Sequence, residues 1–290
     1  MALSESGKRK IQALMRRAAK LGVTPASQMA QSAGAPAAPP PLEPVELARA
    51  CVGVEADAGG ARFWRICRTL GEVSSADSSL ARQYAAVVRG ARQRFDELEA
   101  SAELCRVADG RPEDLLFMDV ESCGLVGAVV FLVGLMHYAD GQFHFEQYLA
   151  RDYAEEPGIL RAFAERLGAA GVLVTFNGKA FDMNLIRERS AFNLLEPLAA
   201  CPPHLDLLHE ARRRWRRRLP NCKLQTLERH LCGRHRVGDI PGAAIADAYH
   251  HYVLTADARR IADIVHHNLM DLLTMAELLC LILTGCEPEG

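Results

Sequence analysis

Two carboxylates, Asp119 and Glu121, stand at the end of an apolar run at residues 115–118. Such a run predicts a strand buried on both faces, and side chains two positions apart on a strand point to the same side. Asp119 and Glu121 therefore face one point, where their charges repel each other unless a cation lies between them. A strand that simply stops at charged residues has the same pattern, so these residues alone leave both interpretations open.

A third carboxylate, Asp182, begins a predicted helix after an apolar strand at residues 172–176 and a turn at residues 177–181. The region just beyond a strand end is the usual place for ligand and metal groups in α/β sheets. The helix dipole by itself also favours an aspartate in the first helical turn. The position of Asp182 does not decide between these explanations.

The last predicted helix, residues 258–283, carries Asp263, His267 and Asp271 at intervals of four. Residues four apart share one face of a helix, so this apolar helix has one ionisable stripe, which is either solvent-exposed or part of a site. Carboxylates from all three places could together hold two divalent cations, Mg²⁺ or Mn²⁺, which stabilise the attacking and leaving oxygens in phosphodiester hydrolysis. A nearby histidine can accept the proton of the attacking water.

The elements that must position these residues are those of a mixed sheet. An apolar run at residues 129–138 is joined through Asp140 and Gly141 to an alternating run at residues 143–149, which predicts a hairpin. With the strand before Asp119, this gives an antiparallel meander of three strands. A helix at residues 155–167 and the strand at 172–176 then predict a mixed sheet with helices on its faces. Further helices are predicted at residues 183–189, 224–231 and 243–254.

Basic residues are concentrated in one stretch of a chain whose net charge is only −2. Residues 204–236 contain ten basic and three acidic residues, and six arginines surround Trp215 between residues 212 and 218. A helix there could grip a phosphate backbone with its arginines and stack a base on the tryptophan. It could equally be a solvated face with Trp215 as a buried anchor, and both interpretations stay open.

Upstream of residue 111 the chain divides into three regions without clustered catalytic residue types. Residues 1–22 contain a predicted basic helix at 4–21, and residues 23–46, with six prolines, six alanines and no basic residue, predict a flexible linker. Residues 47–110 predict a small α+β extension, with two strands around Gly59 and Gly60 and a long helix at 80–104. The main domain is expected at residues 111–285.

Composition limits the class of protein. At 290 residues and 49% hydrophobic content, the chain is long and apolar enough for a real core. Its nine cysteines form no Cys-x-x-Cys pair, which argues against a disulfide framework or a zinc ribbon and favours the reducing cytoplasm. No apolar run reaches the ~18 residues of a membrane span, and the N-terminus lacks the uncharged apolar core that a signal peptide has. We therefore expect a soluble cytoplasmic protein with no membrane segment.

In order and spacing, these motifs resemble the DEDD exonucleases of the RNase H-like superfamily, and the local strings resemble its YprB-type branch. The resemblance covers residues 114–283. The strings that carry it lie at residues 117–121, 173–182, 204–209, 213–217 with 222–228, and 267–271. The string at 173–182, LVTFNGKAFD, is the most specific of them.

The resemblance implies a five-stranded RNase H-like mixed sheet flanked by helices, and removal of nucleotides from the 3′ end of single-stranded DNA or RNA. It also implies that four carboxylates bind the two cations, with the first bridging both: Asp119, Glu121, Asp182 and Asp271. A backbone groove would lie near the arginine-rich stretch. The residues expected to contact nucleic acid are Asn177, Lys179, Arg213, Arg216, Arg217 and Lys223.

Two histidines are candidates for the proton acceptor. One DEDD subclass has a histidine five residues before the last aspartate, which selects His266, whereas the YprB-type string His-Asn-x-x-Asp selects His267. Helix geometry also favours His267, because it lies beside Asp271 and in line with Asp263, which could fix its tautomer. We expect His267 to act, with His266 as the alternative.

Ser122 and Cys123 stand where many relatives have two threonines, so the choice between DNA and RNA stays open.

Two other functions remain possible on the same fold. A structure-specific endonuclease would use the same residues. A non-catalytic nucleic-acid-binding module would not need four carboxylates whose repulsion only a cation relieves, and we therefore favour a nuclease.

Overall fold

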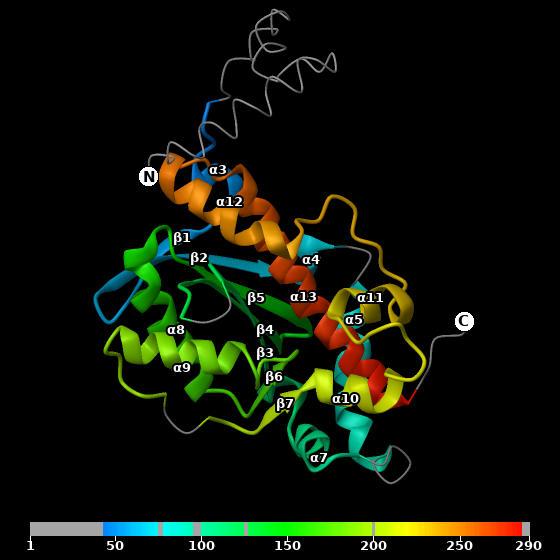
Figure 1. Ribbon diagram of the computed structural model, residues 1–290. Helices are drawn as coiled ribbons and strands as arrows, with labels where there is room; N and C mark the ends of the chain where they lie inside the picture. Colours follow the sequence, from blue (N-terminus) through cyan, green and yellow to red (C-terminus); the bar gives the residue numbers. More distant parts are fainter. Residues whose placement is uncertain (1–42, 75–77, 95–99, 125–126, 199–200, 286–290) are drawn as a thin grey trace, which may run out of the picture. The chain divides into compact units, whose positions relative to one another are not determined.

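A seven-stranded mixed sheet is the centre of the structure, a computed structural model that describes residues 43–74, 78–94, 100–124, 127–198 and 201–285 (Figure 1). The predicted helix at residues 4–21 and residues 23–42 of the predicted linker lie outside the described residues. The strands are β1 (Val54–Ala58), β2 (Ala61–Thr69), β3 (Leu115–Ser122), β4 (Val130–Ala139), β5 (Gln142–Leu149), β6 (Val172–Thr175) and β7 (His204–Asp206). Their order is β1-β2-β5-β4-β3-β6-β7.

The five strands β5-β4-β3-β6-β7 are the mixed sheet that the resemblance implies. The strands β1, β2, β5, β4 and β3 pair antiparallel in that order. Strand β6 pairs parallel with β3, and β7 pairs parallel with β6. The predicted hairpin is confirmed: Asp140 and Gly141 link β4 to β5 with φ of 51° and 82°, as a tight turn with two left-handed central residues requires. Because β3, β6 and β7 run parallel, their carboxyl ends meet at one edge.

The sheet is wider than the predicted five strands at one edge and ends in a very short strand at the other. At one edge, β2 pairs with β5, so β1 and β2 from the expected N-terminal extension continue the same sheet. At the other edge, β7 is a strand of three residues, too short to give a periodic signal. The described residues from Pro44 onward belong to one compact unit.

The helices agree with the predicted ones in the main domain. They are α3 (Leu47–Ala50), α4 (Leu70–Val73), α5 (Ser78–Gly90), α7 (Ala102–Asp109), α8 (Glu156–Gly168), α9 (Asp182–Phe192), α10 (Leu207–Trp215), α11 (Leu224–Leu231), α12 (Gly242–Thr255) and α13 (Arg259–Thr284). The single long helix predicted at 80–104 is wrong. A 3₁₀ turn (Ala91–Arg94) follows Gly90, and Ser101 caps a separate helix α7 by accepting a hydrogen bond from the Leu104 amide.

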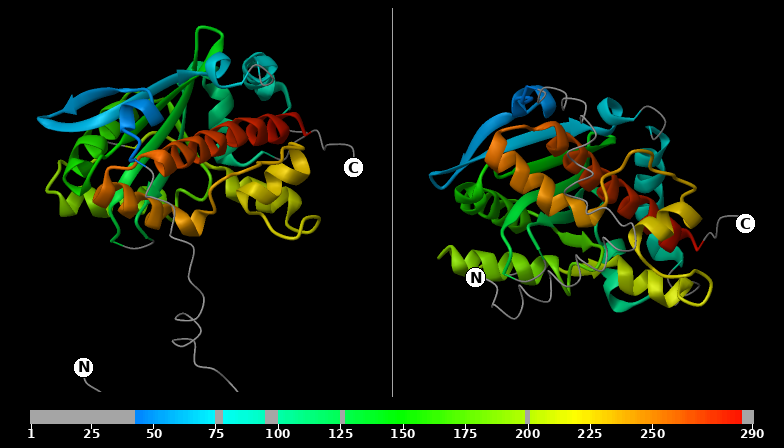
Figure 2. Two further views of the ribbon diagram at one scale, coloured as in Figure 1. Left: turned by 90° about the horizontal axis from the view of Figure 1, so that it is seen from above. Right: turned by 45° about the horizontal axis from the view of Figure 1, so that its top comes forward.

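Helices cover both faces of the sheet (Figure 2). The side chains of β3 identify which helices lie on which face. Leu115 and Phe117 pack in the cluster that contains α5 and α13, whereas Leu116 and Met118 pack in the cluster that contains α8 and α9. Side chains alternate along a strand, so Asp119, two residues after Phe117, lies on the α13 face. The sheet therefore directs the first carboxylate toward the C-terminal helix.

The C-terminal helix α13 is a core element. Most of its residues are buried, and they belong to both apolar clusters. Among the described residues, α13 alone has the length and composition of a membrane-spanning helix, and 72% of its most apolar window is buried inside the protein, as in the core helix of a domain. Near its start, Val45 hydrogen-bonds to Asp257 and Ala258, so residue 45 of the expected linker is attached to the turn between α12 and α13.

The first residue of β7, His204, is a partly buried histidine whose Nε2 lies 2.8 Å from the Thr175 hydroxyl. Burial, and secondarily the positive charge of Lys179, lower the pKa of His204 to about 4. The unfolded chain binds a proton at this residue near pH 6.5, whereas the folded protein does not. The stabilising contribution of neutral His204 is therefore complete above that pH and is lost as the pH falls toward 4.

We predict that His204 accounts for a loss of about 1 kcal/mol in the free energy of unfolding between pH 7 and pH 5.5. The variant His204→Gln keeps an amide that can bond Thr175 but has no titrating group, so its stability should fall less over this interval. Urea unfolding at both pH values measures the difference. His209→Gln, at an exposed histidine, is the control. Equal pH dependence in wild type and His204→Gln would contradict the prediction.

Candidate active site

Four carboxylates from three elements interact at the carboxyl edge of the sheet. Asp119 and Glu121 come from β3, Asp182 is the first residue of α9, and Asp271 comes from α13. Burial raises the pKa of Asp119 well above its usual range, and the charges of Asp271, Glu121 and Asp182 add to the effect. Burial likewise raises the pKa of Glu121, followed by the charges of Asp271 and Asp182. The charges of the other three predicted carboxylates thus act on Asp119.

The other two carboxylates have different surroundings. Burial, and then the charge of Asp206, raise the pKa of Asp182 to about 7. Burial also raises the pKa of Asp271, although the positive charge of Arg236, and after it the neighbouring His267, oppose the effect. Asp271 is therefore the carboxylate that the protein itself partly neutralises.

The chemistry of these residues fits a hard divalent cation. The carboxylates of Glu121 and Asp182 have no hydrogen-bond or ion-pair partner among the described residues, and buried charges without partners are costly. Carboxylate oxygens are the donors that Mg²⁺ and Mn²⁺ prefer. No three His, Cys, Asp or Glu side chains in the described ranges lie close enough together to enclose a metal ion. A cation would therefore have to draw the carboxylates together.

A buried aspartate that the sequence analysis did not single out holds the turn before Asp182. Asp206, at the end of β7, accepts hydrogen bonds from the amides of Asn177 (2.7 Å) and Lys179 (3.1 Å). Asn177 has a left-handed backbone, with φ of 67°, and a side chain on Gly178 would collide with Thr175. The turn therefore needs Asn-Gly, because Asn tolerates a left-handed backbone and Gly has no side chain. In the sequence, only the string His-Leu-Asp at 204–206 indicated a role for Asp206.

Asp239 orients His267, another role that the sequence did not reveal. Nδ1 of His267 lies 2.8 and 2.9 Å from the two carboxylate oxygens of Asp239, and Nε2 lies 3.6 Å from Oδ2 of Asp271. A carboxylate only accepts, so Nδ1 carries the hydrogen and Nε2 keeps its lone pair on the Asp271 side. The prediction that Asp263 fixes this tautomer is wrong, because Asp263 is half exposed and pairs with Arg260. His266 is exposed.

Asn268 connects α13 to Asp119. Its Nδ2 donates to Asp119 Oδ2 (2.9 Å) and to the Asp119 carbonyl (3.2 Å), while its Oδ1 accepts from Gln147 Nε2 (2.8 Å). Asp119, Gly134 and Gln147 lie side by side on three neighbouring strands. Gly134 has no side chain, and Asn268 fills the space that a side chain would take. The residue after His267 in the string His-Asn-x-x-Asp is thus a positioning residue.

A cleft of about 450 Å³ opens beside Asp119 and Asp271. Two residues predicted to contact nucleic acid, Asn177 and Lys223, line it, and so does Arg212, which the prediction omitted. The apolar part of the lining consists of Phe176, Leu208 and Leu224. The cleft therefore combines carboxylates, two cationic side chains and an apolar wall.

The other predicted contact residues lie away from this cleft. Lys179 pairs with Glu103 of α7, and Arg213 pairs with Glu210 at 2.9 Å. The predicted arginine-rich helix is partly wrong, because α10 ends at Trp215, so Arg216 and Arg217 lie in the turn that follows it and are exposed. Trp215 itself is 3% exposed, which confirms the buried-anchor alternative.

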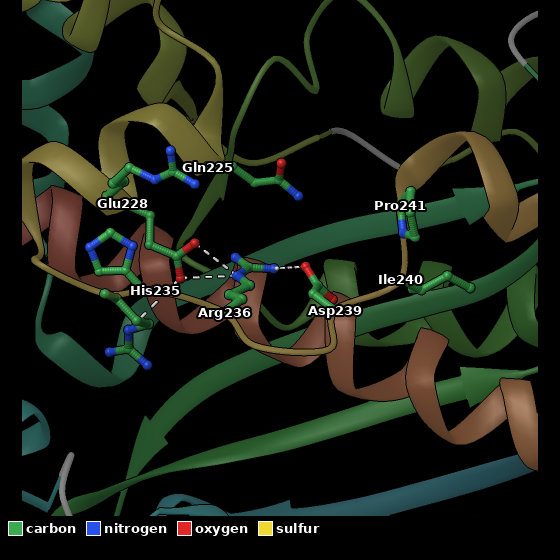
Figure 3. A pocket seen from close by; sticks show the side chains of 9 residues that line it. Gln225, Glu228, His235, Arg236, Asp239, Ile240 and Pro241 are labelled. Atoms are coloured by element: carbon green, nitrogen blue, oxygen red, sulfur yellow. Dashed lines mark hydrogen bonds and ion pairs between the residues drawn. The ribbon is translucent and has the colours of Figure 1, made fainter.

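Arg236 lies in an adjoining pocket of about 280 Å³ (Figure 3). Its guanidinium bonds both oxygens of Glu228 (2.8 and 3.0 Å) and Oδ1 of Asp271 (2.6 Å), and it lies 3.4 Å from Asp239. Arg236 and Asp239 come from an irregular segment between α11 and α12, where no periodicity signals a site.

Known proteins match the part of the chain that carries this site. A family profile described as RNase_H superfamily matches residues 116–282, more than half of the chain, and the chain belongs to this superfamily. RNase H-like nucleases generally use divalent metal ions.

One curated protein and one solved structure are also similar to this chain. The chain is 31% identical over 170 residues to the uncharacterized protein YprB of Bacillus subtilis (strain 168), which covers 57% of this chain and 41% of that relative. The chain thus spans less than half the length of this curated relative. A family B DNA polymerase from the hyperthermophilic archaeon Pyrobaculum calidifontis matches with a TM-score of 0.46 and 14% identity, over 57% of this chain and 24% of the polymerase.

We predict that Gly134→Ala destabilises the protein by about 1–3 kcal/mol, because the added methyl group would displace the buried Asn268 side chain from Asp119. Urea unfolding measures the change. Gly168→Ala, at the end of α8 where an added methyl group meets nothing within 4 Å, is the control and should shift stability by less than about 1 kcal/mol. Wild-type stability of Gly134→Ala would show that Asn268 does not require this space.

Proposed function

We propose that this protein is a DEDD-type 3′–5′ exonuclease that hydrolyses single-stranded DNA or RNA with two divalent cations, Mg²⁺ or Mn²⁺. The observation that carries this proposal is the meeting of four mutually repelling carboxylates beside an oriented histidine, at a cleft lined by Arg212 and Lys223. Nine cysteines without a metal or disulfide spacing support a cytoplasmic location.

The cations would be held by Asp119, Glu121, Asp182 and Asp271. When bound, they would supply charge stabilisation at the phosphate and a more acidic attacking water. Glu121 and Asp182, whose carboxylates lack partners among the described residues, are free to serve as ligands. Asn268 holds Asp119 in place through its hydrogen bond to Oδ2.

The protein's own residues would move the proton and hold the substrate. Asp239 fixes the hydrogen of His267 on Nδ1, so Nε2 can take the proton of the attacking water as a general base. Arg212 and Lys223 can bond phosphate oxygens along the cleft, and Phe176 offers an aromatic ring to a base. Arg216 and Arg217, which have no ion-pair partner among the described residues, can hold the strand farther out.

We predict that the wild-type protein, with Mn²⁺ or Mg²⁺, shortens 5′-labelled single-stranded DNA or RNA to a ladder that starts at the 3′ end. Asp119→Asn should lower the rate by roughly 100-fold or more, because it removes a carboxylate that would hold the cations, and the cations would stabilise the charge of the transition state. Product lengths on a denaturing gel, with and without EDTA, measure both effects. Asp263→Asn, at the half-exposed aspartate of α13, is the matched control and should retain activity.

The outcomes of this assay separate the alternatives. A protein that shortens neither substrate with either metal, or an Asp119→Asn variant as active as wild type, would contradict the proposed nuclease. Binding without cleavage would favour a non-catalytic nucleic-acid-binding module. Cleavage of circular single-stranded DNA would favour an endonuclease.

We predict that Arg212→Ala/Lys223→Ala weakens binding to single-stranded DNA and flattens its salt dependence. The slope of log K against log salt should change by about 0.7 for each lost phosphate contact. Fluorescence anisotropy over a series of NaCl concentrations, with the catalytically inactive Asp119→Asn background, measures the slope. The triple variant Arg213→Ala/Arg216→Ala/Arg217→Ala tests the outer arginines in the same way. An unchanged slope would show that the replaced side chains do not contact phosphates.

A further inference from the structure

Arg236 places a positive charge of the protein beside one of the four carboxylates. Its side chain is 8% exposed, and its Nη2 donates to Asp271 Oδ1 at 2.6 Å. On the other side, its Nε donates to both oxygens of Glu228, whose side chain is 2% exposed (Figure 3). A guanidinium held in this way is a charge-assisted, geometrically fixed partner for Asp271.

This contact distinguishes Asp271 from the other carboxylates. Glu121 and Asp182 have no ion-pair partner among the described residues. Asp119 Oδ2 accepts a hydrogen bond from the neutral amide of Asn268. Asp271 instead has Arg236 on Oδ1 and His267 3.6 Å from Oδ2. A cation that is to bind Asp271 therefore meets an oxygen already bonded to a positively charged group.

We infer that Arg236 is a positioning residue that competes with the divalent cation for Asp271 and thereby weakens metal binding. The inference rests on the proposed metal site. A guanidinium and a divalent cation beside one carboxylate repel each other, and the hydrogen bond from Arg236 occupies a lone pair of Oδ1 that the cation could otherwise use. Binding of the cation through Oδ1 thus requires Arg236 to loosen or give up its bond to Asp271.

Arg236 can give up its bond to Asp271 and still remain paired with Glu228. Its bidentate bond to Glu228 does not involve Asp271, and Glu228 is held in turn by the hydroxyl of Thr274 at 3.0 Å. Arg236 lies between Gly233 and Gly238, which have left-handed backbones with φ of 63° and 77°. The guanidinium can therefore move relative to Asp271 without leaving a buried charge alone.

Calorimetric titration of the metal-free, full-length protein with MnCl₂ tests the inference without any activity measurement. Arg236→Gln should bind Mn²⁺ roughly 10-fold or more tightly than wild type, because it removes a charge-assisted hydrogen bond that competes for the ligand. Arg234→Gln is the matched control. Arg234 is on the same segment but pairs with Glu277 and Glu228, so its replacement removes an equal charge nearby and should change the affinity less than about 3-fold.

A second variant guards against misfolding of the first. Glu228→Gln/Arg236→Gln replaces the buried ion pair by two neutral amides that can bond each other, and it should bind Mn²⁺ as tightly as Arg236→Gln. Circular dichroism melts identify which variants are folded. Equal or weaker Mn²⁺ binding by the folded variants than by wild type overturns the inference. Asp119→Asn separates this result from failure of the site: binding that Asp119→Asn does not reduce counts against the proposed metal site itself.

Discussion

Repulsion among carboxylates at the end of β3 is the constraint on which the rest of the structure depends. Burial, together with the charges of Asp271 and Asp182, raises the pKa values of Asp119 and Glu121. The protein places these groups close together and then surrounds them with polar groups that fix their positions: Asn268 on Asp119, Arg236 on Asp271 and Asp206 behind the turn that leads to Asp182. The sheet and α13 supply the rigid frame that this arrangement needs.

The sequence predicted the parts that regular patterns determine. The apolar run before Asp119, the Asp-Gly hairpin and the strand before Asn177 locate the sheet, and alternation along β3 puts Asp119 on the face that α13 covers. The helical spacing from His267 to Asp271 likewise placed both residues at the site. In each case a short-range period of two or four residues was enough, because the strand or helix carries the side chains to one side.

Residues on irregular segments could not be predicted in this way. Arg236 and Asp239 reach the site from a segment without a repeating pattern, and their role depends on tertiary contacts. Arg212 lines the cleft, whereas Arg213 pairs with Glu210, and Arg216 and Arg217 follow the end of α10 at Trp215. The prediction that Asp263 contacts His267 was wrong for a similar reason. Residues four apart share a face of a helix, but this spacing does not show which residues from other segments contact that face.

The position of α13 in both apolar clusters gives the two walls of the cleft different mechanical properties. One wall, with Asp119 and Asp271, belongs to β3 and α13, so its backbone can shift only if the core of the domain shifts. The other wall, with Arg212, Asn221 and Lys223, comes from α10 and the irregular chain between α10 and α11, where most residues are exposed or half-buried. On the proposed function, adjustment to substrates of different shape would therefore belong to the basic wall, while the acidic wall keeps its backbone fixed and only its side chains move toward a cation.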